Sequence, residues 1–299
     1  MTTVINIPQS LDENSFEEVL EQVAPLPADA KMLLDARHTK WASPYGLTAL
    51  LTLGQTRDAS GGGPRATLAV PEADDTLSYW SRANFFFYAD DLFDLKGIVP
   101  RRGQSGDSQV LLEITPVSKS EDIHDVVGRI QQKAQQILAT ELGIDPKAIV
   151  GFAMTLSEVC QNIIEHAGRG GWVMVQTYDW RRRLGRRVVV IAVCDAGVGF
   201  RESLETSGNH EPSDRWDDAA ALEAAVIRGV SRFRDPGRGQ GLAGVRKYVG
   251  RWGGKLSVRS GSARIAIVPD WDEDVPLQEN LPSFPGAQIQ VTIPERIAR

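Results

Sequence analysis

The stretch VCDAGVGF, residues 193–200, decides the fold of this chain. It continues an almost unbroken apolar run that begins at Val188, which is typical of a fully buried strand. The strand ends in a lone acid, Asp195, and a buried carboxylate is costly unless another group pairs with it. Gly197 and Gly199 follow, and two such close glycines suggest that a foreign group approaches the backbone. On its own, the stretch is more often a tight turn in which the aspartate bonds its own loop.

The composition is that of an ordinary globular protein. The 299 residues are 42% hydrophobic and 24% charged, which is enough for about two domains. The net charge of −6 argues against a general nucleic-acid binder. We expect a cytoplasmic protein without a membrane partner, because no apolar stretch is long enough for a bilayer and the N-terminus has no signal pattern. Cys160 and Cys194 are interpreted as small core residues.

The chain divides into three parts, and the predicted class is α/β (α+β). Residues 1–100 alternate strand and helix signals, residues 101–118 are a linker with a first strand, and residues 119–299 form a second domain. In the first part we expect strands at 3–8, 31–37 and 66–70, a capping box formed by Asn14 and Glu17, a helix capped by Ser43 before Pro44, and core and edge-strand packing for FFFY (85–88).

The second domain begins with two helices and a hairpin. One helix is expected over 120–141 and the next from Asp145-Pro146 to about His166. The hairpin strands flank RRRLGRR, whose arginines are interpreted as a solvated tip. A polar stretch over 201–236 fits a lid, and a glycine-rich turn, a helix and three strands follow. The acidic insert 269–284 is interpreted as a surface loop, in which Trp271 and Phe284 make partner contact plausible.

A helical motif, LSEVCQNIIEHAG (156–168), places Glu158, Asn162 and His166 on one stripe, because they are four residues apart. A carboxylate and an amide oxygen one turn apart suit Mg²⁺. A carboxylate there could also activate an attacking group. Taken alone, the stripe is more often a solvated helix face.

A glycine-rich motif, Gly237, Gly239 and Gly241 with Leu242, leads directly into a helix. Backbone N–H groups at a glycine-rich helix start form an anion site. The motif is not a Rossmann fingerprint, because a polar loop precedes it. It is not a Walker A loop either, because no Lys-Ser/Thr pair follows the last glycine.

In this order, the three motifs resemble the N, G1 and G2 boxes of the GHKL ATPase superfamily, which includes gyrase, Hsp90-type chaperones, histidine kinases and MutL. The resemblance covers about residues 120–299 and continues into GGKLSVRSG and PGAQIQVTIP. It implies the Bergerat fold, a mixed sheet with helices on one face and ATP between them under a mobile lid. We expect the segment 201–236 to become ordered only when nucleotide is bound.

The resemblance also implies roles for the motif residues. Asn162 would hold Mg²⁺, Glu158 would be the catalytic or water-polarising carboxylate, and Asp195 would read adenine. Gly197 and Gly199 would line the base. The phosphates would be wrapped by Gly237, Gly239 and Gly241, followed by Leu242. His166 would face the phosphates, although a surface position is about equally expected for it.

Within the superfamily, the helical motif looks most like that of the anti-sigma serine kinases. A histidine kinase is disfavoured, because the only upstream histidines, His38 and His124, lack a phosphoacceptor box. MLLDARHTKWASPYGLTALLTLG (32–54) resembles the core of a STAS domain, and SYWSRANFFF (78–87) resembles a segment that often follows it. The acceptor serine of that family sits just before the loop glycine, and here Tyr45 precedes Gly46. The serine-phosphorylation switch is therefore in doubt.

Three functions remain open, and whether the chain is an enzyme is left undecided. The first is a STAS–GHKL fusion that uses Mg·ATP for phosphoryl transfer to a partner protein or for slow hydrolysis. The second is a non-catalytic switch or scaffold, in which ATP alters partner binding through the STAS-like domain. A DNA-handling ATPase ranks last, because no transducer domain follows the core. ATP, ADP and a partner protein are the expected partners, and a homodimer stays open.

Overall fold

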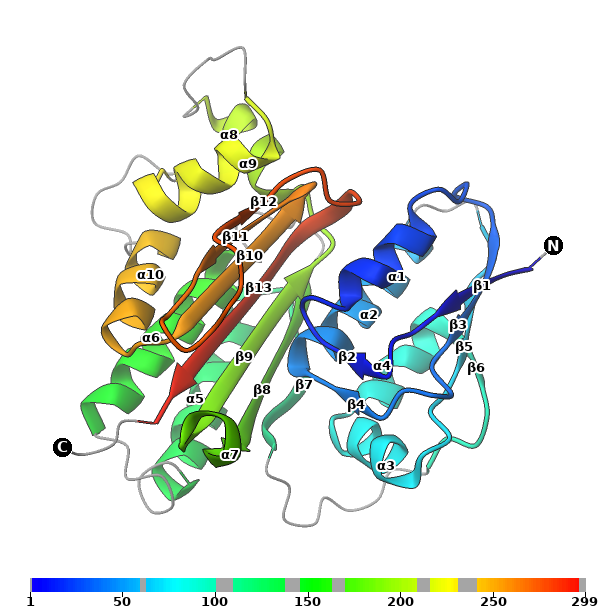
Figure 1. Ribbon diagram of the computed structural model, residues 1–299, viewed down its shortest axis with the longest axis horizontal. Helices are drawn as coiled ribbons and strands as arrows, with labels where there is room; N and C mark the ends of the chain where they lie inside the picture. The colour runs from blue at the N-terminus through cyan, green and yellow to red at the C-terminus, as the bar shows by residue number, and fades with distance from the viewer. Residues whose placement is uncertain are drawn as a thin grey trace.

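The computed structural model describes residues 2–59, 63–100, 110–137, 146–162, 170–208, 216–230 and 241–295. It contains a four-stranded sheet from the N-terminal part, a seven-stranded sheet from the rest, and a short two-stranded sheet. The two larger sheets lie on either side of helix α2 (Figure 1). This mixed architecture confirms the predicted α/β class.

The N-terminal sheet is parallel, in the order β1-β3-β5-β6. Ser43 caps the helix that follows β4, because its Oγ accepts the Gly46 N–H at 3.0 Å and Pro44 occupies the first helical position. This confirms the predicted cap. The elements are β1 (Thr2–Asn6), β2 (Ser10–Leu11), α1 (Phe16–Val23), β3 (Lys31–Asp35), β4 (Trp41–Ala42), α2 (Pro44–Ala59), β5 (Ala66–Ala69), α3 (Asp74–Arg82), α4 (Phe85–Leu92) and β6 (Phe93–Lys96).

The aromatic run FFFY is helical, so the prediction of edge-strand packing was wrong. Asn84 adopts a left-handed conformation with φ of 62°, which ends α3 and lets α4 begin at Phe85. Phe85, Phe86 and Ala89 then face the core together, as helical spacing allows. Tertiary packing therefore overrides the β-propensity of three consecutive phenylalanines.

The larger sheet has the order β12-β11-β10-β13-β9-β8-β7, and neighbouring strands pair antiparallel. Helices α5, α6 and α10 cover one of its faces (Figure 1). The elements are β7 (Val110–Val117), α5 (Ser120–Ile137), α6 (Pro146–Asn162), β8 (Gly171–Trp180), α7 (Arg181–Leu184), β9 (Arg186–Asp195), α8 (Gly199–Ser207), α9 (Asp218–Leu222), the π-helix η2 (Glu223–Arg228), α10 (Gly241–Arg251), β10 (Lys255–Gly261), β11 (Ala263–Ile267), β12 (Leu277–Gln278) and β13 (Phe284–Pro294).

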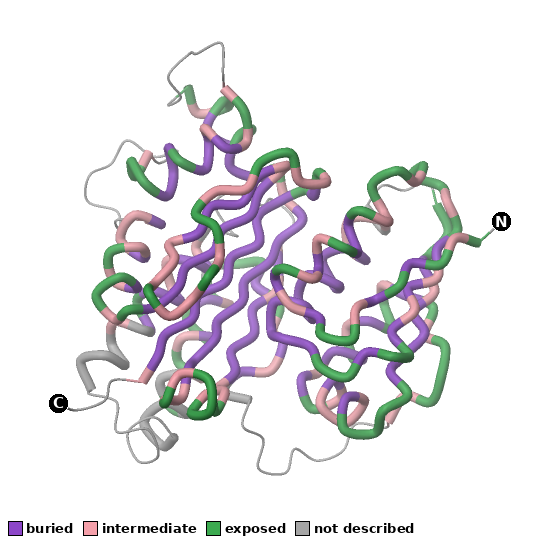
Figure 2. The backbone as a smooth tube through the Cα atoms, viewed as in Figure 1, coloured by how far each residue is buried: buried purple, intermediate pink, exposed green. Residues whose placement is uncertain are grey.

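Strand β9 is apolar along its length because both of its faces are covered. Val189, Ile191 and Val193 join the core formed with the helices of the larger sheet. Ala192 and Cys194 point the other way, into a core shared with the N-terminal part. Helix α2 packs on this second face, against β8, β9 and β13. The strands of the larger sheet therefore lie in the buried middle of the molecule (Figure 2).

The expected polar lid over 201–236 is largely a packed helical segment in its described residues. Helices α8 and α9 and the π-helix η2 occupy parts of 199–228, and Leu204, Leu222 and Val226 are buried in the core of the larger sheet. That the stretch becomes ordered only when nucleotide is bound stays a prediction, and the burial of these apolar side chains argues against it for the three helices. The segments 209–215 and 231–240 lie outside the described residues.

Within the described ranges, no helix combines the length and the hydropathy that a membrane crossing requires.

Candidate functional site

Asp195 ends β9 as a buried carboxylate, as the sequence predicts. It is 5% exposed, and its Oδ1 accepts the N–H of Gly197 at 2.8 Å. Burial raises its pKa to about 7, although the backbone N–H groups of Gly197 and Ala287 lower it in part. A carboxyl that changes charge near neutral pH is a frequent property of functional sites.

Gly199, in the turn after Asp195, is required by the packing of the turn itself. Gly199 has a φ of +75°, and a Cβ there would lie 2.6 Å from Ser260 Oγ. Gly286 on β13 has a φ of +79°, and its Cβ would lie 2.0 Å from the carbonyl oxygen of Asp195. Ser260 Oγ accepts the Phe200 N–H at 3.1 Å and donates to the Gly286 carbonyl at 2.8 Å. These contacts hold the turn after Asp195 in place.

Glu158 lies on α6, on the side of the sheet that carries the helices, and is half-buried. Its neighbours Leu156, Val159 and Cys160 are buried in the core, which leaves the Glu158 stripe away from it, as the spacing predicts. Burial raises the Cys160 pKa to about 12, as expected for a core thiol. Asn162 is the last residue of α6, and its side chain and all of His166 fall outside what the structure describes.

Helix α10 begins at Gly241, with the left-handed φ of +52°. Among the described residues, no atom lies within 4 Å of a Cβ built there. Leu242 is buried in the core, and it therefore anchors the helix instead of lining a cavity. Gly237 and Gly239 lie outside the described residues.

Helices α6 and α10 approach closely at Gly151, where a Cβ would overlap the ring of Tyr248. Glu158 lies seven residues, about two turns, after Gly151 on α6, and Gly241 lies seven residues before Tyr248 on α10. The close packing fixes how the two helices sit against each other.

These groups have the chemistry that an adenine nucleotide requires. A buried carboxylate can accept a hydrogen bond from the adenine amine, and the N-terminus of an 11-residue helix can bind phosphate oxygens. For Mg²⁺, no cluster of three or more His, Cys, Asp or Glu side chains occurs in the described ranges. The metal-holding role of Asn162 stays a prediction.

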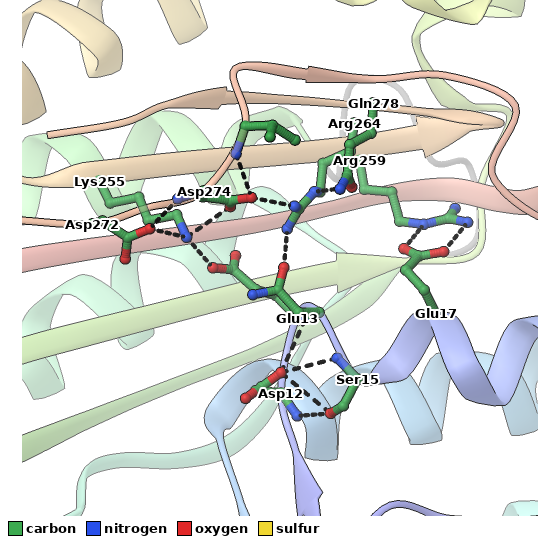
Figure 3. Close-up of polar contacts among 12 residues, drawn as sticks. Asp12, Glu13, Ser15, Glu17, Lys255, Arg259, Arg264, Asp272, Asp274 and Gln278 are labelled. Atoms are coloured by element: carbon green, nitrogen blue, oxygen red, sulfur yellow. Dashed lines mark hydrogen bonds and ion pairs between the residues drawn. The ribbon is translucent and has the colours of Figure 1, made fainter.

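Polar groups that no sequence motif predicts join the N-terminal part to the other face of the sheet. Asn14 and Glu17 form no capping box, because both reach across this junction. Arg264 donates to Asn14 Oδ1 at 2.7 Å, and Arg259 binds both oxygens of Glu17, at 2.6 and 3.1 Å (Figure 3). Asp12 replaces the predicted box, because its Oδ1 accepts the backbone N–H groups before α1.

The acidic insert is also part of this junction. Lys255 lies among three carboxylates, with Nζ 2.7 Å from Glu13, 2.8 Å from Asp274 and 3.2 Å from Asp272. Phe284 is buried against Phe16, with ring centroids 5.7 Å apart. The interpretation of 269–284 as a surface loop was therefore wrong for its buried members. A signal was present in KLSVRS, whose alternation places Lys255 and Arg259 together on one face of β10.

Tyr45 is buried at the start of α2. Its ring packs edge-on against Phe16, and its hydroxyl has no hydrogen-bond partner in the described part of the chain. Burial raises its pKa well above 10. The hydroxyl at the position of the expected acceptor serine is therefore inaccessible in this arrangement.

One family of known proteins matches the C-terminal half of the chain. Residues 148–297, about half of the chain, match the family model of the histidine kinase-, DNA gyrase B-, and HSP90-like ATPases. The match includes Glu158, Asp195 and Gly241. No curated protein matches the chain.

Proposed function

Because the chain belongs to the family of histidine kinase-, DNA gyrase B-, and HSP90-like ATPases, we propose that it binds Mg·ATP and transfers the terminal phosphoryl group to a hydroxyl of a partner protein. The observation that carries the proposal is the buried Asp195 carboxylate at the end of β9, beside a rigid glycine turn. Bound Mg·ATP supplies the phosphoryl group, with its charge partly neutralised by the metal.

The residues of this chain then have distinct tasks. Asp195 accepts a hydrogen bond from the adenine amine and orients the base. The N-terminus of α10 at Gly241 stabilises negative charge on the phosphates. Glu158 takes the proton of the acceptor hydroxyl. The hydroxyl oxygen then bonds to the terminal phosphorus of ATP, and the bond from that phosphorus to the ADP oxygen breaks. Water in place of the hydroxyl gives slow hydrolysis.

In this proposal the N-terminal STAS-like part is a scaffold to which the partner protein binds. Its support is the burial of Tyr45, which keeps the loop of the expected acceptor out of reach.

The experiment uses labelled ATP, the full chain and a co-purified partner. Glu158→Gln should lower label transfer by about 100-fold or more, because general-base catalysis is lost, while ATP affinity is kept. Glu121→Gln, at an acidic position in the first turn of α5, is the control and should leave transfer unchanged. Transfer that persists in Glu158→Gln would contradict the role of Glu158.

A non-catalytic switch is the second candidate, and one contact favours it. Thr48 Oγ1 on α2 lies 3.2 Å from Cys194 Sγ, next to Asp195. A shift at the proposed nucleotide-binding end of β9 would therefore reach the N-terminal part directly. Tight ATP binding without transfer or turnover, together with changed partner affinity, would favour the switch over the kinase.

A further inference from the structure

A cavity of about 120 Å³ lies between the N-terminal part and the sheet, at a distance from the proposed nucleotide site. Val190 of β9 lines it, and Asp195 ends that strand five residues, or roughly 17 Å, further on. The volume equals that of about four water molecules, so the cavity holds a small head group and not a nucleotide.

Aromatic rings form one wall of this cavity. Trp41, Tyr178, Trp180 and Trp271 follow one another, with ring centroids 5.8, 6.3 and 6.3 Å apart between successive members. They come from β4, from β8 and from the acidic insert, so only the folded chain brings them together. Faces of tryptophan and tyrosine rings attract cations.

A buried cluster of charged groups borders the cavity, and its members Glu13, Lys255 and Asp272 belong to the lining. Glu13, Asp272 and Asp274 surround the single ammonium group of Lys255, and Arg264 adds one more positive charge beside Asp274, at 2.6 Å (Figure 3). Three carboxylates share two cations, and burial raises the pKa of Glu13 although Lys255 lies beside it. Glu13 lines the cavity and is 5% exposed, and its Oε2 has no hydrogen-bond partner among the described residues. A buried carboxylate oxygen without a partner is costly unless a cation approaches it.

The exposed edge of the cavity already places a cation on an aromatic ring. The guanidinium carbon of Arg183 lies 5.1 Å from the centre of the Trp180 ring. Arg183 is exposed and lies on the short helix α7, so it can move away from Trp180 without disturbing the core. It shows where a cation from solution would bind.

We propose that this cavity binds an alkylammonium group, held by the tryptophan faces and by the unpartnered carboxylate oxygen of Glu13. The inference does not depend on the proposed kinase activity, because none of these residues belongs to the nucleotide site.

Tryptophan fluorescence of the full chain, titrated with choline, tests the proposal. We expect saturable quenching by choline and none by 3,3-dimethylbutan-1-ol, the neutral molecule of nearly the same shape. Trp180→Leu should weaken choline binding roughly tenfold or more. Trp172→Leu, on the same strand but outside the cavity lining, is the matched control and should bind choline as the wild type does. Arg183→Ala should bind choline more tightly, because the competing cation is removed.

Calorimetric titration covers variants whose fluorescence is altered. Choline binding that is absent in the wild type, or equal for the neutral alcohol, or unchanged in Trp180→Leu, would overturn the proposal. N-acetyl-trimethyllysine methylamide distinguishes the source of the ligand. Tighter binding of this compound than of choline would indicate a modified side chain of a partner, and weaker binding a free metabolite.

Discussion

Asp195 shows how one residue can be recognised in the sequence and understood only in the structure. The apolar run before it predicts a buried carboxylate, and the structure confirms the burial. The cause of the raised pKa is this burial, which the hydrogen bond from Gly197 offsets only in part. The carboxyl is therefore protonated to a large extent just below neutral pH.

Replacement of Asp195 tests its role in reading adenine. Asp195→Asn should weaken ATP binding sharply and leave the fold intact, because the amide of similar shape lacks the charged acceptor. In the wild type, ATP affinity should rise as the pH increases through about 7, since the amine of adenine favours the ionised carboxylate and binding lowers its pKa. Isothermal titration between pH 6 and 8 measures both effects. An unchanged affinity in Asp195→Asn would contradict the assignment.

At the scale of elements, periodicity predicted the strands and helices with long, regular patterns. The hairpin β8–β9, the amphipathic α5 and the capped start of α2 are where the sequence places them. Periodicity did not predict α4, because three consecutive phenylalanines carry no pattern that separates helix from strand. It also failed for α8 and α9, whose short apolar faces are hidden among polar residues.

The turn that leads from β9 into α8 provides a test at this scale. Gly199 and Gly208 flank α8 with similar positive φ angles, but only at Gly199 does a Cβ meet other atoms. Gly208→Ala should cost about 1 kcal/mol, because only the left-handed backbone is penalised. Gly199→Ala should cost about 2–4 kcal/mol, because overlap with Ser260 is added. Chemical denaturation measures both, and equal losses would show that the contact with Ser260 is unimportant.

At the scale of the whole molecule, the N-terminal part and the larger sheet share a hydrophobic core and a set of buried ion pairs. Helix α2 supplies the apolar contact, and the segment 12–17 supplies most of the charged contacts. The sequence predicts two separate domains joined by a linker. It could not match Glu17 with Arg259, because 242 residues separate them.

Removal of one buried partner should therefore destabilise the molecule. Arg259 is 0% exposed, so Arg259→Met should lower the free energy of unfolding by about 3–5 kcal/mol, because Glu17 is left without its cation. Adding Glu17→Met should restore part of the loss. Urea denaturation measures these changes, and Arg181→Met, in an exposed pair with Asp179, should leave stability unchanged. A loss in Arg259→Met that the second substitution does not reduce would contradict a direct pairing.

The sequence by itself determined the α/β class, the buried strand that ends in Asp195 and the helix that carries Glu158. Each depends on local periodicity or on a short motif, and both are properties of neighbouring residues. The tertiary structure alone decided what covers the second face of β9, where Asn14 and Glu17 make their contacts, and which aromatic rings meet around the cavity beside Glu13. These features depend on side chains hundreds of residues apart, and burial and charge pairing act between them only after the chain has folded.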